Sequence, residues 1–248
     1  MNMDILRAMV MKDLSEIRRN KLMLYPLLLM PIIFSIIVPL ATVMGLQDAS
    51  ISAKERTIML SIITSGFIPL FILIPAAISN IISSYSFVGE KTEKTLEPLL
   101  ATPATDSELL MGKMLSAFIP AVVATLIAFV IFTIVVDAVS YPQLGYLLVP
   151  NITWLMAILL LSPLIALLSI IVSIIFSARM SDPRAVQQMS VLVMLPFIAL
   201  FLGGVNQLIV VNDMLMLALI AVIAVIDWFL FSLAKKLFER EAILTKWK

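Results

Sequence analysis

Residues 89–113 form the longest charged stretch between two apolar runs of this sequence, GEKTEKTLEPLLATPATDSELLMGK. The chain as a whole is 62% hydrophobic. A charged side chain at the centre of a bilayer costs about 2.5–3.5 kcal/mol, so this stretch cannot cross the hydrocarbon. We therefore expect it to be a polar connection between two membrane-spanning helices.

The first half of this connection has a helical pattern. Leu96, Leu99 and Leu100 fall on one face at helical spacing, and Glu90 and Lys94 form an i,i+4 pair in the favourable order. An exposed apolar surface rimmed by charge is typical of a docking site. The alternative is an ordinary solvated hairpin.

The second half contains a break and a new helix start. Pro103 lacks the N–H that an interior helical turn needs, so the helix should end before it. Thr105 and Glu108 have the spacing of a capping box, which predicts a second helix that begins at this point.

The rest of the chain predicts a single all-α membrane domain over residues 1–248. Six spans are expected, at about 22–46, 58–80, 114–136, 152–176, 187–202 and 214–234. An amphipathic helix over residues 1–20 precedes them, with one apolar face made of Met3, Leu6, Val10, Leu14 and Ile17. This helix should lie in the membrane interface; the alternative is a cytosolic helix packed on a partner.

Several spans carry features of their own. Pro26, Pro31 and Pro39 predict a kinked first span packed against other helices. Residues 57–89 carry no charge and would make a helix of about 50 Å, so the second helix should continue beyond the ~30 Å hydrocarbon into the charged stretch. Trp154 is expected to be an interface anchor. Residues 205–212 are apolar but too short to cross, and we expect a re-entrant helix there.

The distribution of basic residues predicts the orientation. With six spans, 15 of the 17 Lys and Arg residues fall on one side of the membrane. Only Lys54 and Arg56 fall on the other. The positive-inside rule then places both termini and residues 89–113 in the cytoplasm.

The composition and the motifs exclude several kinds of chemistry. The sequence has no Cys and no His, which removes thiol catalysis, histidine acid–base catalysis and the usual zinc or haem ligands. No GxxxxGK[ST] loop is present, because Gly89-Glu90-Lys91-Thr92 lacks the upstream glycine. We expect no enzyme activity and no bound cofactor in this chain, and no nucleic-acid partner.

Two segments resemble a known family. The first runs from Glu93 to Pro103 (EKTLEPLLATP) and is followed by Glu108-Leu109-Leu110 and Gly112-Lys113. It is similar to the cytoplasmic loop of ABC-2 type transporter permeases. The second, Asp182 to Gln188 (DPRAVQQ), resembles the segment before the fifth span in the sodium-extruding Nat-type branch of that family.

This resemblance implies a function and a set of partners. The chain would be the membrane subunit of an ABC exporter in the cell membrane, working as two permeases with two separate ATPase subunits that bind ATP and Mg²⁺. Its cytoplasmic loop would be the coupling helix that contacts the ATPase. The implied contact residues there are Glu90, Glu93, Thr95, Leu96, Glu97, Leu99, Leu100, Thr102 and Pro103, and those of the second inner loop are Asp182, Arg184 and Gln187. The substrate, which could be a sodium ion, a drug or a lipid, is not identified by the sequence.

Two alternatives follow from the residues. A secondary transporter or channel usually needs ionisable side chains in mid-membrane, and Asp227 meets that description. Asp227 could be a pathway residue; the interpretation we favour is a structural carboxyl, either protonated or bonded to a polar side chain of a neighbouring helix. An intramembrane hydrolase is the other alternative, but neither HExxH nor GxSxG is present.

Overall fold

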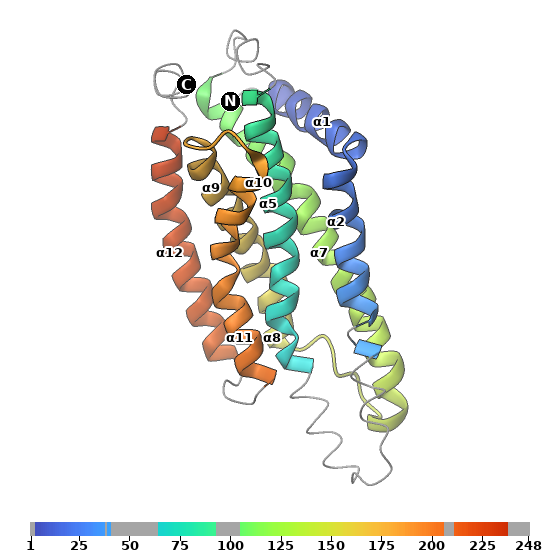
Figure 1. Cartoon of the computed structure of the whole chain (residues 1–248). Helices are drawn as coiled ribbons and strands as arrows, with labels where there is room; N and C mark the ends of the chain where they lie inside the picture. Colours follow the sequence, from blue (N-terminus) through green and yellow to red (C-terminus); the bar gives the residue numbers. More distant parts are fainter. Residues whose placement is uncertain (1–2, 38, 41–63, 93–104, 206–210, 238–248) are drawn as a thin grey trace.

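The computed structural model describes residues 3–37, 39–40, 64–92, 105–205 and 211–237. Within these ranges the chain is almost entirely helical and contains no strand, which confirms the predicted all-α class. Long helices run alongside one another in an elongated bundle, and the first helix lies across one end of it (Figure 1).

The helices follow the apolar runs of the sequence. They are α1 (Met3–Arg19), α2 (Lys21–Ile32), α5 (Ile68–Thr92), α7 (Asp106–Leu144), α8 (Ile152–Met156), α9 (Ser162–Ser177), α10 (Pro183–Ser190), α11 (Leu195–Val205) and α12 (Asp213–Leu237). A π turn over Ile33–Ile37 extends α2, and another over Ala157–Leu161 joins α8 to α9. A 3₁₀ turn over Val191–Val193 separates α10 from α11.

Four of these helical segments are long and apolar enough to cross a membrane: Thr64–Glu90, Ser107–Pro142, Ile152–Ser177 and Asp213–Lys235. The number rises to six if two bent pairs each count as one span. The pairs are Leu6–Arg19 with Lys21–Ile37, bent by 85°, and Pro183–Val193 with Leu195–Gly204, bent by 45°. Residues 206–210, within the predicted re-entrant segment, lie outside the described residues.

The corner between α1 and α2 is formed by one residue. Asn20 adopts an extended backbone conformation, and its side-chain oxygen accepts the backbone N–H of Leu22 at 3.0 Å. This N-cap begins a new helix in a new direction because it satisfies a donor that the first turn of α2 would otherwise leave unpaired. The 85° bend therefore directs α1 across the end of the bundle (Figure 1).

The core is centred on α5, which packs against α2, α7, α9, α10 and α11. At one end of the bundle Phe71 of α5, Phe132 of α7 and Trp154 of α8 form an aromatic cluster, with ring centroids 4.6–5.2 Å apart. The prediction that Trp154 anchors the chain at the membrane interface is wrong, because its side chain is fully buried in this cluster. Ring contacts with Phe71, Phe129 and Phe132 outweigh exposure of the indole at the surface.

A polar seam holds α10 against α5 and α9. The Asn80 amide of α5 donates to the backbone oxygen of Gln187 at 3.2 Å and accepts the hydroxyl of Ser173 at 3.0 Å. Ser173 also lies 3.3 Å from the hydroxyl of Ser190. Because these groups are buried in an apolar bundle, their mutual bonds fix which faces of the helices meet.

Candidate functional site

Four charged side chains meet where α1 crosses the ends of α5 and α7. Glu90 of α5 accepts an ion pair from Lys12 of α1 at 2.7 Å and another from Lys113 of α7 at 2.5 Å. Asp13 of α1 completes the group, which we call the ionic cluster: Lys12, Asp13, Glu90 and Lys113. Two cations and two carboxylates make it neutral overall, as burial requires.

Lys113 is the centre of the ionic cluster, with only 1% of its side chain exposed. Its ammonium group has three N–H donors. They are matched by the Glu90 carboxylate, the Ser86 backbone oxygen at 3.2 Å and the Ser86 hydroxyl at 3.3 Å. The ammonium also lies 5.2 Å from the centroid of the Phe87 ring. The donors of the Lys113 ammonium are therefore satisfied within the protein although the side chain is buried.

Serine hydroxyls connect Asp13 to both neighbouring helices. Ser116 of α7 donates to the Asp13 carboxylate at 2.7 Å, and Ser86 of α5 donates to the same oxygen at 3.3 Å. At the exposed edge, burial alone would lower the pKa of Lys12, but the hydrogen bond and charge of Glu90, with the charges of Asp13 and Glu16, raise that pKa above its ordinary value. Lys12 is therefore held in its charged form by the cluster.

Close approach of the backbones brings α1 and α7 together. A Cβ atom added to Gly112 would lie only 3.0–3.3 Å from atoms of the Met9 side chain on α1. A glycine here lets α7 lie directly against α1, one residue before Lys113 enters the cluster. Gly112 therefore allows α7 to lie close against α1, and the next residue, Lys113, joins the ionic cluster at that contact.

The ionic cluster lies at the base of the connection between α5 and α7. α5 ends at Thr92 and α7 begins at Asp106, so Glu90 lies in the last turn of α5 before segment 93–104 and Lys113 about two turns into α7 after it. The predicted capping box is confirmed: the Thr105 hydroxyl accepts the Glu108 N–H at 3.3 Å, and the Glu108 carboxylate accepts the Thr105 N–H at 3.0 Å. The prediction that the second helix continues into the charged stretch is also confirmed.

The coupling residues predicted from the sequence divide into two groups. Those between the two helices lie outside the described residues: Glu93, Thr95, Leu96, Glu97, Leu99, Leu100, Thr102 and Pro103. Glu90 is described, and its side chain lies in the interior rather than on an open surface; its contact with an ATPase stays a prediction. Its side chain is only 6% exposed and is occupied by Lys12 and Lys113.

The second predicted loop is described and does not join the ionic cluster. Asp182 is the N-cap of α10, where its carboxylate accepts the N–H of Arg184 at 3.0 Å. The Arg184 side chain is exposed. Gln187 belongs to the polar seam through its backbone oxygen, and its buried side-chain nitrogen has no hydrogen-bond partner among the described residues.

Asp227 stands apart from both groups. It lies on α12, which packs mainly on α9, and it is 7% exposed. Neither carboxylate oxygen has a hydrogen-bond partner within the described part of the chain. A polar partner on a neighbouring helix was one form of the structural interpretation, and the described residues provide none.

Sequence reasoning missed Lys12, Asp13, Lys113, Ser86 and Ser116. One signal for Asp13 was present: it lies three residues after Val10 and four before Ile17, so it falls on the apolar face predicted for this helix. A carboxylate on a buried face needs a partner. Its partners Ser86 and Ser116 come from helices distant in sequence, which no local pattern identifies.

Helices long and apolar enough to cross a membrane, four of them or up to six with the bent pairs, define a polytopic integral membrane protein. The family described as ABC-2 family transporter protein matches residues 14–182, and the chain belongs to this family. The matched region holds α5, α7 and the connection between them, and Lys113 and Glu90 with it. It ends at Asp182, so it leaves the Nat-type resemblance of residues 182–188 untested. No curated protein matches the sequence significantly.

Proposed function

We propose that this chain is the permease subunit of an ATP-binding cassette exporter. It would lie in the cell membrane with six spans, α1 at the cytoplasmic surface and both termini inside. The basic residues support this orientation, since the end of the bundle where α1 lies carries Lys12, Arg18, Arg19 and Lys21. The first span would be α2 with its π turn, Lys21–Ile37, and the fifth would be the bent pair from Pro183 to Gly204.

The observation that carries the proposal is the ionic cluster. It ties α1, α5 and α7 into one unit at the end of the bundle from which segment 93–104 leaves α5 and returns to α7. A force applied to that segment would move the three helices together, because separating them would leave buried charges unpaired. An ATPase bound there could therefore move membrane helices without a flexible joint in between.

The contact with the ATPase is proposed for the segment between the helices. Leu96, Leu99 and Leu100 would enter a cleft of the ATPase, with Glu93 and Glu97 at the rim and Thr95, Thr102 and Pro103 shaping the turn. Glu90 would anchor the segment from behind rather than touch the partner. Asp182 and Arg184, exposed at the same end of the bundle, would form a second, smaller contact.

The assembly would contain two permease chains and two ATPase subunits. ATP and Mg²⁺ would be bound by the ATPase, since this chain has no GxxxxGK[ST] loop. The substrate would cross between the two permeases. If the chain belongs to the Nat-type branch, a sodium ion would be the substrate; a drug or a lipid is the other proposal.

The coupling contact can be tested with Leu96→Ala combined with Leu99→Ala. Buried apolar anchors cost about 2 kcal/mol or more when truncated, so we expect the variant to lose most ATPase binding in a pull-down. Met214→Ala with Leu217→Ala, two exposed side chains of α12, is the matched control and should bind normally. Normal binding and transport by the Leu96/Leu99 variant would show that this segment is not the coupling element.

One observation favours a second candidate function. Asp227 is a buried carboxyl without a partner among the described residues, as an ion-coupled secondary transporter would place in mid-membrane. Co-purification with a soluble ATPase discriminates between the two: the exporter requires it, and a secondary transporter would transport without it.

A further inference from the structure

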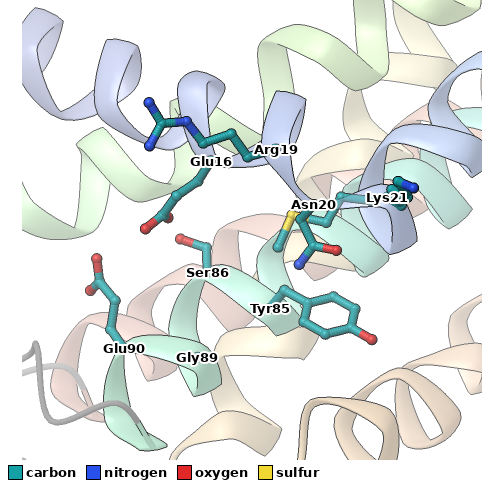
Figure 2. Close-up of a pocket in the computed structure, with 9 residues that line it drawn as sticks. Glu16, Arg19, Asn20, Lys21, Tyr85, Ser86, Gly89 and Glu90 are labelled. Atoms are coloured by element: carbon teal, nitrogen blue, oxygen red, sulfur yellow. The ribbon is translucent and has the colours of Figure 1, made fainter.

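A cavity of about 450 Å³ lies in the corner between α1 and α2, against the side of α5. It is lined by Glu16, Arg19, Asn20, Lys21, Met23, Tyr85, Ser86, Gly89 and Glu90. Figure 2 shows polar side chains entering it from both helical layers. Its α5 wall includes Ser86 and Glu90, which also contact the ionic cluster, and none of the functions proposed above places a ligand in it.

The cavity is lined by charges of both signs. Asn20, Lys21 and Tyr85 lie on one side and Glu16, Ser86 and Glu90 on the other, with the Arg19 side chain beside Glu16 (Figure 2). A ligand that fits both sides needs a negative group and a positive group a short distance apart. A simple anion would face two carboxylates, and a simple cation would face lysine and arginine.

Several of these groups have no other use in the described part of the chain. The Asn20 oxygen caps α2, which leaves its NH₂ group free to donate. Lys21, Arg19 and Glu16 make no ion pair among the described residues, and the Tyr85 hydroxyl makes no hydrogen bond there. Glu90, in contrast, already holds Lys12 and Lys113. Partial burial raises the pKa of the Glu16 carboxyl, so this group gains from a cationic partner.

Apolar side chains continue from the cavity along α2. Leu22, Tyr25, Leu28, Leu29 and Ile32 are exposed large hydrophobic residues that follow directly after Lys21. The sequence thus changes from charged to apolar at the corner, as it would where headgroups meet hydrocarbon. The ligand that matches this change has a charged head and an apolar tail.

We propose that the cavity binds the headgroup of an aminophospholipid. Its phosphate would accept hydrogen bonds from Lys21, Asn20 and Tyr85, its ammonium would donate to Glu16, and its acyl chains would lie along the exposed face of α2. The proposal rests on the placement of α1 at the membrane surface proposed above. The bound lipid would connect the α1–α2 corner to α5, beside the ionic cluster.

The test measures lipid retained by the purified full-length chain in detergent, without any ATPase. The protein is incubated with phosphatidylethanolamine, phosphatidylcholine or phosphatidylglycerol, washed, and examined by native mass spectrometry. We expect about tenfold more bound phosphatidylethanolamine than phosphatidylcholine, because the trimethylammonium group has no N–H to donate to Glu16. Inorganic phosphate and glycerophosphoethanolamine, added as competitors, should displace little of it.

Variants separate the two halves of the site. Glu16→Gln should remove the preference for phosphatidylethanolamine, and Lys21→Gln should lower retention of phosphatidylethanolamine and phosphatidylcholine about tenfold. Arg18→Gln is the matched control, since Arg18 is an exposed cation of the same corner that does not line the cavity. Both changed side chains are exposed, so the fold should survive them.

Four results would overturn the proposal. Equal retention of all three lipids, or an unchanged preference in Glu16→Gln, would show that no headgroup site exists. Strongest binding of phosphatidylglycerol would show a site for anionic lipids instead. Displacement by inorganic phosphate as readily as by lipid would show a phosphate site. None of these results depends on ATPase binding, so failure here is distinct from failure of the coupling proposal.

Discussion

Some buried charged side chains of this protein have ion-pair or hydrogen-bond partners, and Asp227 has none among the described residues. Lys113 has three acceptors for its three N–H groups, and Glu90 has two lysines. Asp227 has no hydrogen-bond partner on either oxygen within the described residues. The two kinds should respond in opposite ways when the charge is removed, because the penalty for burial is compensated in one and uncompensated in the other.

Glu90→Gln should destabilise the protein by about 3 kcal/mol or more, because it leaves the Lys113 ammonium buried without its carboxylate. Thermal unfolding in detergent, compared with the wild type, measures the effect. Replacing the pair together, Glu90→Leu with Lys113→Met, should recover much of the lost stability, since an apolar pair of similar volume needs no partner. A double variant no more stable than Glu90→Gln would contradict this account of the ionic cluster.

Asp227→Leu should leave stability unchanged or raise it by up to about 2 kcal/mol, because it removes a buried polar group that has no bond to lose. Asp227→Asn should change transport less than tenfold. Unfolding in detergent and a transport assay are the measurements. A large destabilisation would reveal a polar partner, and loss of transport with normal ATPase coupling would make Asp227 a pathway residue.

Among the helices, α5 takes part in all three sets of contacts described above. It contributes Phe71 to the aromatic cluster, Asn80 to the polar seam and Glu90 to the ionic cluster. The long uncharged run predicted one extended helix, and that part follows from sequence because helix length depends on local pattern. The three sets of contacts could not be predicted, since each partner lies on a helix far along the chain.

Local and distant signals explain which site features were predictable. The Thr105–Glu108 capping box spans three residues, and its bonds form as its spacing predicts. The family resemblance implied that Glu90 contacts the ATPase. The structure gives it partners 78 residues earlier, at Lys12, and later on α7, at Lys113. Charge in a sequence therefore marks a polar position without telling whether water or another charge satisfies it.

Asn80→Leu should weaken the contact of α5 with α9 and α10. The change removes the hydrogen bonds of the Asn80 amide to the Gln187 backbone oxygen and the Ser173 hydroxyl. These two groups would then need other hydrogen-bond partners. Interhelical hydrogen bonds in membranes are worth roughly 0.5–2 kcal/mol each, so we expect a loss of stability of that order. Ser84→Ala is the control: Ser84 is also buried on α5, but its hydroxyl bonds within its own helix and should be dispensable. Equal stability of the Asn80 variant and the control would contradict the seam.

At the scale of the molecule, the two ends of the helical bundle carry different kinds of residues. α1, the end of α5, the start of α7 and the end of α12 lie together at one end of the bundle (Figure 1). The aromatic cluster and the Asp137 carboxylate, which accepts the N–H groups of Leu148 and Val149, lie toward the other. One end therefore carries the ionic cluster and the basic residues of the described ranges. At the other end, the backbone at Leu148 and Val149 is hydrogen-bonded to Asp137. This asymmetry is what the proposed orientation requires.

The orientation can be tested by labelling single cysteines, since the sequence contains none of its own. The structure selects the positions: Glu90 and Lys113 are buried and would resist any reagent, whereas Tyr146, Leu147 and Arg184 are exposed. An impermeant maleimide added to intact cells should label Tyr146→Cys and Leu147→Cys but not Arg184→Cys or Lys94→Cys. The last two should react only after the membrane is permeabilised, which also shows that the variants are present and accessible. Labelling of Lys94→Cys from outside would invert the orientation. It would then place the segment between α5 and α7 where no cytoplasmic ATPase could reach it, and the coupling proposal would fail with it.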